Sequence, residues 1–157
     1  RTVYKGAPPL RTKKETERIK ELILSGQVDA IATSHSPQPQ HLIDLPFEEA
    51  PYGTIGLETA FAVSATELNA PLSEILSAMS WVPAEIAGLE ATHGGVLSEG
   101  RPGNLIVVDE NKQWSPSVSE IAIKNMDSPF DGCQLTGKIK DTLVNGNVVV
   151  SNGEVQI

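Results

Sequence analysis

The stretch "TKKETERIKELILSGQVDAIAT", residues 12–33, decides the fold, because it reads as a helix followed directly by a strand. Thr12 and Glu15 form the T-x-x-E pattern of a capping box at the start of the helix, and Gly26 suits the left-handed residue that ends one. Residues 28–33 are apolar on both faces, which is typical of a strand buried in a parallel sheet.

A short segment of alternating character, residues 1–5, precedes this helix and completes a strand–helix–strand unit with a right-handed crossover. Residues 34–55 then form a long polar loop, and loops of this length in compact domains are often functional. After the loop we expect one largely buried helix over residues 56–68 and two short helices with Pro71 and Pro83 in their first turns.

The character of the sequence changes near residue 93, where glycine-rich turns begin to flank β-branched runs. Asn145 and Asn152 are each followed by glycine, which predicts two type I′ hairpins and therefore a three-stranded meander at the end of the chain. We expect residues 117–135 to be irregular. The predicted organisation is an α/β part over residues 1–93 and a small β domain over residues 94–157.

Composition narrows the class of protein. The formal net charge of −8 opposes binding to nucleic acid, and no apolar run is long enough to span a membrane. Cys133 is the single cysteine, so an internal disulfide and a cysteine-based zinc cluster are excluded. No signal peptide opens the chain, and we expect a reducing cytoplasm. Because residue 1 is Arg1 rather than methionine, we also expect the chain to have been cut from a longer polypeptide.

Four stretches, in this order, resemble the C-terminal part of a dihydroorotase, a member of the cyclic amidohydrolases: "APPLR" (7–11), "IATSHSPQ" (31–38), "PFEEAPYGTIGLETA" (46–60) and "SPFDGCQLTGKIKDTLVNG" (128–146). The resemblance implies an α/β fold, namely the last strands and helices of a (β/α)8 barrel followed by a small β domain of the amidohydrolase β-sandwich type. Residues 1–5 would be barrel strand seven and residues 28–33 strand eight, and the first six strands would lie outside this chain.

The resemblance also implies a chemistry, in which one or two zinc ions help to open and close a cyclic amide. The family's aspartate at the end of strand eight, a metal ligand and general base, falls on Ser34, whose hydroxyl is a poor base. The family's substrate-binding histidine and asparagine fall on Gln38, which carries no charge, and Ala7, which has no polar group. No residue of this chain is predicted to bind metal, and we expect no zinc on it.

Other residues of the same loops have two interpretations. His35 could contact substrate or metal, but a structural histidine that bonds neighbouring backbone is the favoured interpretation. By family position, Pro51 and Gly53 would offer backbone contacts to substrate, and these contacts would be vestigial if the site is silent.

Two functional hypotheses follow from the resemblance. In the first, the chain belongs to a catalytically silent, dihydroorotase-like structural subunit of pyrimidine biosynthesis. Its partners would be the missing N-terminal barrel portion, aspartate transcarbamoylase and further copies of itself, with no nucleic acid and no membrane. In the alternative, the protein is an active zinc-dependent dihydroorotase with an altered strand-eight loop, in which a neighbouring acid such as Asp44 replaces the lost aspartate.

Overall fold

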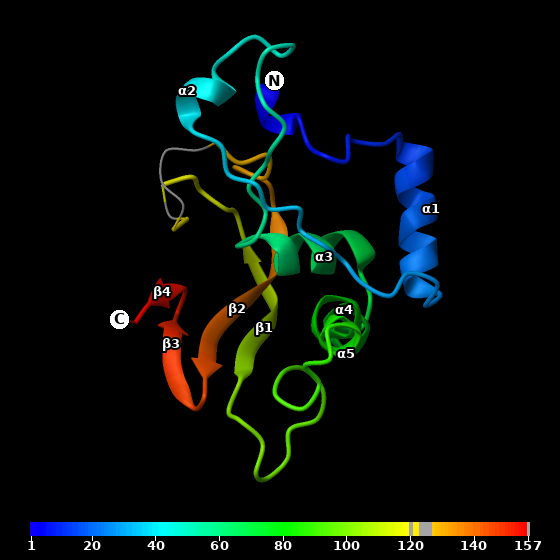
Figure 1. Cartoon of the computed structure of the whole chain (residues 1–157), viewed down its shortest axis with the longest axis vertical. Helices are drawn as coiled ribbons and strands as arrows, with labels where there is room; N and C mark the ends of the chain where they lie inside the picture. Colours follow the sequence, from blue (N-terminus) through cyan, green and yellow to red (C-terminus); the bar gives the residue numbers. More distant parts are fainter. Residues whose placement is uncertain (120, 123–126, 157) are drawn as a thin grey trace.

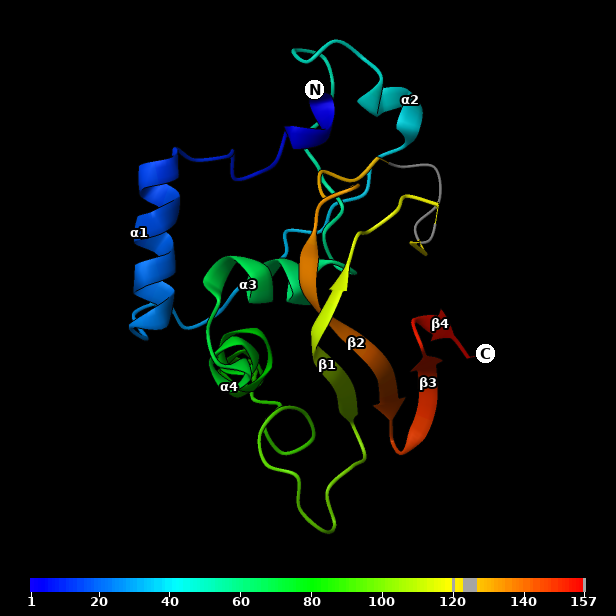
Figure 2. The same cartoon turned by 180° about the vertical axis from the view of Figure 1, so that it is seen from behind.

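The computed structural model describes residues 1–119, 121–122 and 127–156. Its helical elements are η1 (Thr2–Tyr4), α1 (Lys13–Leu24), α2 (Gln40–Ile43), α3 (Ala60–Leu68), α4 (Leu72–Leu76), the π-helical turn η2 (Ser77–Trp81) and α5 (Val82–Ile86). Its strands are β1 (Leu105–Trp114), β2 (Leu135–Val144), β3 (Asn147–Ser151) and β4 (Glu154–Val155). In Figures 1 and 2 the sheet lies on one side, α3 and α4 lie beside it, and α1 stands outermost. None of the described helices combines the length and the apolar character that a bilayer crossing requires.

Both ends of α1 form as the sequence predicts. The Thr12 hydroxyl accepts a hydrogen bond from the Glu15 N–H at 3.4 Å, and the Glu15 carboxylate accepts one from the Thr12 N–H at 3.0 Å. Hydrogen bonds from Thr12 lower the pKa of Glu15, so the cap is lost only as the pH falls through that lowered pKa. Gly26 has φ 69°, and the N–H groups of Gly26 and Gln27 bond to carbonyls three and five residues back, which closes the helix.

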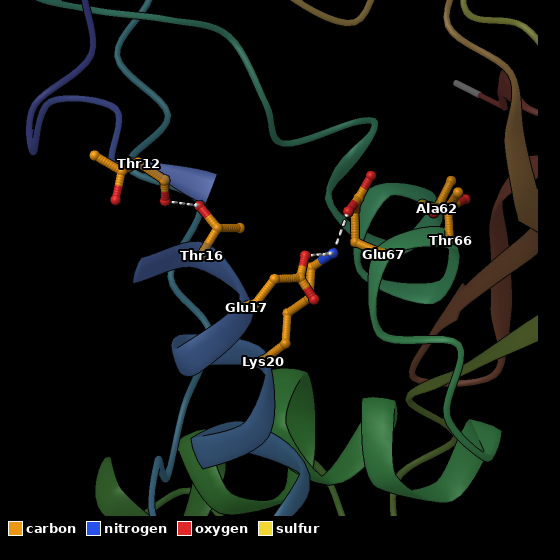
Figure 3. Close-up of polar contacts among 7 residues, drawn as sticks. All are labelled: Thr12, Thr16, Glu17, Lys20, Ala62, Thr66 and Glu67. Carbon is orange, nitrogen blue, oxygen red and sulfur yellow. Dashed lines mark hydrogen bonds and ion pairs between the residues drawn. The ribbon is translucent and has the colours of Figure 1, made fainter. Parts of the chain in front are cut away.

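One ion pair ties α1 to the rest of the molecule. The Lys20 ammonium lies 2.7 Å from the Glu67 carboxylate of α3 and 3.3 Å from that of Glu17 within α1 (Figure 3). The hydrogen bond to Glu67 raises the pKa of Lys20. Exposed pairs of this kind stabilise a fold only weakly. Since α1 buries no residue fully, it is attached mainly through this pair and the packing of Ile23.

The strand–helix–strand prediction is wrong. Residues 1–5 contain the short helix η1 instead of a strand, and residues 28–33 form neither a strand nor a buried segment, since Asp29 and Ala30 are exposed. A parallel strand needs a neighbouring strand to bond its backbone groups. Among the described residues neither run lies beside a strand, because the described strands form one separate sheet, β1-β2-β3-β4.

A π-helical turn supplies one of the hydrogen bonds that a neighbouring strand would have given to residues 28–33. The sequence predicts two separate short helices, but the backbone is helical without a break from α4 through η2 to α5. Pro83 has no N–H, and the Val82 N–H bonds to the Ser77 carbonyl five residues back. The Ala78 carbonyl, which Val82 would satisfy in an α-helix, accepts a hydrogen bond from the Ile31 N–H at 2.9 Å. The predicted strand-eight segment is therefore held by a helix.

The C-terminal hairpins confirm the sequence prediction. β1, β2, β3 and β4 form one antiparallel sheet in that order, so β1 adds a fourth strand to the predicted meander. Asn145 and Asn152 both have φ 50°, and the glycines that follow them also have positive φ, as type I′ turns require. Within residues 117–135 the described part is irregular up to the start of β2, while residues 120 and 123–126 lie outside it. The division near residue 93 stays a prediction.

The core lies where α3 packs on β2. Phe61, Leu68 and Ile75 are buried together, with Val108 and Ile139 of the sheet packed against them. A Cβ added to Gly137 would lie 3.1 Å from the Phe61 ring and 3.4 Å from the Ala65 side chain. The Thr66 hydroxyl also accepts a hydrogen bond from the Thr136 N–H at 2.8 Å. Glycine at position 137 thus lets the helix approach the strand closely.

We expect Gly137→Ala to destabilise the protein more than Gly132→Ala. Both glycines have positive φ, 88° and 74°, but an added Cβ at position 132 meets nothing within 4 Å. The backbone strain, about 1–2 kcal/mol, is therefore shared, and overpacking adds about 1–3 kcal/mol at position 137 alone. Urea unfolding of the two variants measures the difference, and equal losses would contradict the packing argument.

Candidate functional site

Two segments of the long loop run side by side and form the candidate site. His35 and Thr54 form a parallel β-bridge, and the Ser36 N–H bonds to the Thr54 carbonyl at 2.9 Å. Gly53 is buried beside them with φ 152°, and a Cβ there would lie 2.5 Å from the Ser36 carbonyl and 2.8 Å from Gln38 Cγ. Only glycine fits this approach, so the sequence determines how closely the two segments pack.

His35 is used to hold the loop. Its Nδ1 accepts hydrogen bonds from the Gly56 and Leu57 N–H groups, both at 3.2 Å. A ring nitrogen that accepts carries no proton, so the proton of the neutral ring is on Nε2. The hollow beside the ring, lined in part by Glu58 and Ser128, has a volume of about 10 Å³, which is room for one water molecule.

Ser34 has a backbone conformation that is uncommon for serine. Its φ is 48°, in the left-handed region, where aspartate and asparagine are several-fold enriched among non-glycine residues. Its side chain is exposed. The loop therefore presents a backbone geometry that suits aspartate, while the side chain offers only a hydroxyl.

Lys5 is the site residue that the sequence analysis missed. The side chain is buried, and its Nζ donates hydrogen bonds to the carbonyls of Phe47 at 2.5 Å, Ala50 at 2.7 Å and Glu48 at 3.4 Å. The same nitrogen lies 5.0 Å from the ring centroids of Phe47 and Tyr52. One ammonium group thus holds the segment over residues 46–52 in place. In the sequence, the signal that could have indicated this role is a lysine that follows apolar residues in "VYKG".

The remaining predicted residues occupy separate places. Gln38 is half-buried, and its amide donates to the Ser36 hydroxyl at 3.3 Å. Pro51 lies in the segment held by Lys5, two residues before Gly53. Ala7 is exposed, and within the described part of the chain no hydrogen bond joins it to the loop. The structure therefore brings His35, Gln38 and Gly53 together, and near Ala7 the chain meets this group through the Lys5 carbonyl, which accepts a hydrogen bond from the Gly53 N–H at 3.0 Å.

The residues present do not form a zinc site by themselves. Over residues 1–119, 121–122 and 127–156, no three or more His, Cys, Asp and Glu side chains gather as a metal would need. Ser34 offers a hydroxyl where the resembled family has a carboxylate, and Nδ1 of His35 is occupied by backbone N–H groups.

Sequence comparison identifies similar proteins. The model of the amidohydrolase family matches residues 7–149. The dihydroorotase of Elusimicrobium minutum is 36% identical over 154 residues, covering 96% of this chain and 35% of that protein. The dihydroorotase of Acetivibrio thermocellus is 35% identical over 153 residues, covering 95% of this chain and 35% of that protein. The chain thus spans about a third of the length of these curated relatives.

Solved structures of hydantoinases have a similar backbone fold. The L-hydantoinase (dihydropyrimidinase) of Arthrobacter aurescens superposes with a TM-score of 0.90 at 28% identity, covering 99% of this chain and 36% of that one. The D-hydantoinase (dihydropyrimidinase) of Thermus sp. superposes with a TM-score of 0.88 at 23% identity, covering 99% and 35%. The backbone follows the path of these folds over nearly the whole chain, even where strand hydrogen bonds are missing.

We expect Lys5→Met to loosen the segment over residues 46–52, with exposed Lys13→Met as the control. Methionine keeps the aliphatic stem but removes three donors, and hydrogen bonds to a charged group contribute about 1.5–3 kcal/mol. Cleavage after Glu48 and Glu49 by a glutamate-specific protease should become at least about tenfold faster in the Lys5 variant. An unchanged cleavage rate would show that Lys5 does not hold this segment.

Proposed function

The chain belongs to the amidohydrolase family, and from this premise we propose that it is part of a dihydroorotase-like protein of pyrimidine biosynthesis that is catalytically silent and acts as a structural subunit. The family is metal-dependent, and the curated relatives of this chain are dihydroorotases. Because the chain spans about a third of their length, the activity and partners of the whole protein belong to the proposal.

Ser34 supports this proposal most directly. Its left-handed backbone, φ 48°, suits the aspartate that the family has at this position, yet the side chain is a hydroxyl that neither takes up a proton near neutral pH nor binds zinc well. The backbone retains the loop conformation, and the group that would do the chemistry is lost.

The surrounding residues show the same contrast. Gln38 and Ala7 replace a histidine and an asparagine that bind substrate in the resembled family. In contrast, the groups that shape the loop are retained: the Lys5 ammonium on three carbonyls, the His35 ring on two N–H groups, and Gly53 at a backbone contact. Selective loss at reactive positions is what a structural subunit would undergo.

The partners we propose are the N-terminal barrel portion, aspartate transcarbamoylase and further copies of the same chain. Large apolar side chains are well exposed on the α/β part, among them Leu10 at 72%, Leu57 at 62% and Ile86 at 67%. Exposed apolar residues of this size are often covered by another protein surface. Two unpaired barrel segments likewise leave backbone groups for a neighbour to bond.

The second candidate function is an active zinc-dependent dihydroorotase, which the dihydroorotases at 32–36% identity favour. Asp44 would then have to replace the lost aspartate. It ends α2, is exposed, and accepts a hydrogen bond from the Gln40 amide at 2.9 Å. Asp44→Ala tests this route, because it should abolish turnover if Asp44 is the base and leave turnover unchanged if it is not.

We expect the longest native product that contains this chain to bind no stoichiometric zinc and to show no turnover of dihydroorotate. Ser34 cannot supply the carboxylate that a metal ligand and general base requires. Zinc content and turnover are measured on one preparation, with a dihydroorotase of the same family as the positive control. Stoichiometric zinc together with turnover would overturn the silent-subunit proposal.

A reversal experiment sharpens this test. The triple variant Ala7→Asn, Ser34→Asp and Gln38→His restores the three family side chains on a loop whose backbone already suits aspartate at position 34. We expect measurable turnover from this variant and none from the matched variant with Ser34→Asn, which fits the same backbone but brings no carboxylate. Equal activity in both variants would contradict the role given to the aspartate position.

We also expect the native product to form a stable complex with aspartate transcarbamoylase from the same organism. Light scattering on mixed and separate samples measures the mass of the particle. Co-elution at a mass equal to a defined ratio of the two proteins supports a structural subunit, and elution of both at their separate masses contradicts this partner.

A further inference from the structure

A cavity lies on the β sheet, away from the loops of the candidate site. It is lined by five polar residues of β1, β2 and the β3–β4 turn: Asp109, Lys112, Lys138, Lys140 and Asn152. Its volume is about 230 Å³. Pockets for drug-sized ligands are about 300–1,000 Å³, so this cavity suits a smaller ligand.

A bulge in β1 brings Lys112 to the cavity. Asp109 pairs with Lys138 and Gln113 pairs with Thr136, so three residues of β1 stand opposite one residue of β2. The Asp109 carboxylate accepts a hydrogen bond from the Asn111 N–H at 3.2 Å, which stabilises the bulged backbone. Bulges of this kind redirect side chains and occur often beside binding sites.

A second bulge, in β2, brings Lys140 to the same cavity. Val107 pairs with Asp141 and Val108 with Ile139, which leaves Lys140 without a partner in the ladder. The Gly153 N–H bonds to the Lys140 carbonyl at 3.3 Å, and this contact places the β3–β4 turn over the cavity. Asn152, in that turn, supplies the amide at its edge.

The cavity is positively charged, whereas the whole chain is negatively charged. Three lysines face one aspartate in the cavity, whereas the chain as a whole carries a formal charge of −8. In the part of the chain that the structure describes, none of these three ammonium groups is in an ion pair, although carboxylates outnumber basic groups by 20 to 12. Lys138 lies over the Trp114 ring at 5.0 Å from its centroid.

We propose that this cavity binds the dianionic phosphate group of a small ligand. Ammonium groups bind phosphate as point charges, and three of them with one amide donor match the several oxygens of a phosphate better than the two oxygens of a carboxylate. The negative charge of the chain and the limited volume of the cavity exclude an extended nucleic acid as the ligand.

The test is a titration of the full chain with inorganic phosphate at constant ionic strength, measured by calorimetry. We expect saturable binding at one site, and Lys112→Gln combined with Lys140→Gln should weaken it at least about tenfold. Lys13→Gln combined with Lys14→Gln is the matched control, because it removes the same charge from exposed positions of α1 outside the cavity. The control should keep the affinity within about twofold.

The fluorescence of Trp114 shows whether phosphate binds in this cavity. In a Trp81→Phe background, Trp114 is the remaining tryptophan of this chain, and phosphate that draws Lys138 from its ring should change its fluorescence with the same midpoint as the calorimetric titration. Calorimetry on the chain without the Trp81 substitution stands by itself if that variant does not fold. Circular dichroism checks the fold of every variant.

Three outcomes would overturn the proposal: no saturable binding up to about 20 mM phosphate, equal weakening in the cavity and control variants, or acetate binding as tightly as phosphate at the same ionic strength. A comparison of inorganic phosphate with glycerol phosphate distinguishes the two sources of the group. Equal affinities support a site for free phosphate, and tighter binding of the ester supports a site for a phosphorylated metabolite.

Discussion

The close contact between the Phe61 ring and Gly137 is the constraint on which the rest of the structure depends. It joins the helices to the sheet, because α3 can approach β2 only where the strand has no side chain. The same helix follows directly on the segment that carries Gly53 and Gly56. The position of α3 on the sheet therefore fixes the end of the loop that forms the candidate site. Lys5 and His35 hold this loop further back, through hydrogen bonds to the backbone of Ala50 and Gly56.

Local features could be predicted from the sequence, and features that depend on distant neighbours could not. The capping box at Thr12, the glycine end of α1 and the two Asn-Gly hairpins are determined within a few residues, and all of them formed as predicted. The run over residues 28–33 was predicted to be a buried strand from its apolar character alone. A strand also needs a partner, and here the Ile31 N–H bonds to a helical carbonyl at Ala78 that the π turn leaves open.

In the candidate site, too, local features could be predicted and features that depend on distant residues could not. The backbone-bonding histidine at position 35 was predicted because it lies just after the apolar run over residues 28–33, at the start of the long loop. The lysine inside "VYKG" could have marked Lys5 as unusual, but its carbonyl partners could not be predicted, since they lie 42 to 45 residues away in the chain. The left-handed backbone of Ser34 is likewise invisible in the sequence, because serine is an unusual choice for that conformation.

The bulge in β1 has a consequence for how the molecule meets other chains. β1 is an outer strand of the described sheet, and Ile106 and Val107 on it are 39% and 43% exposed. An open edge of this kind can accept an extra strand from another polypeptide. Beyond Asp109 the backbone leaves the regular ladder over "ENK" (residues 110–112), so an added strand would keep its register for about five residues only. The sheet thus limits its own growth into larger aggregates at its β1 edge.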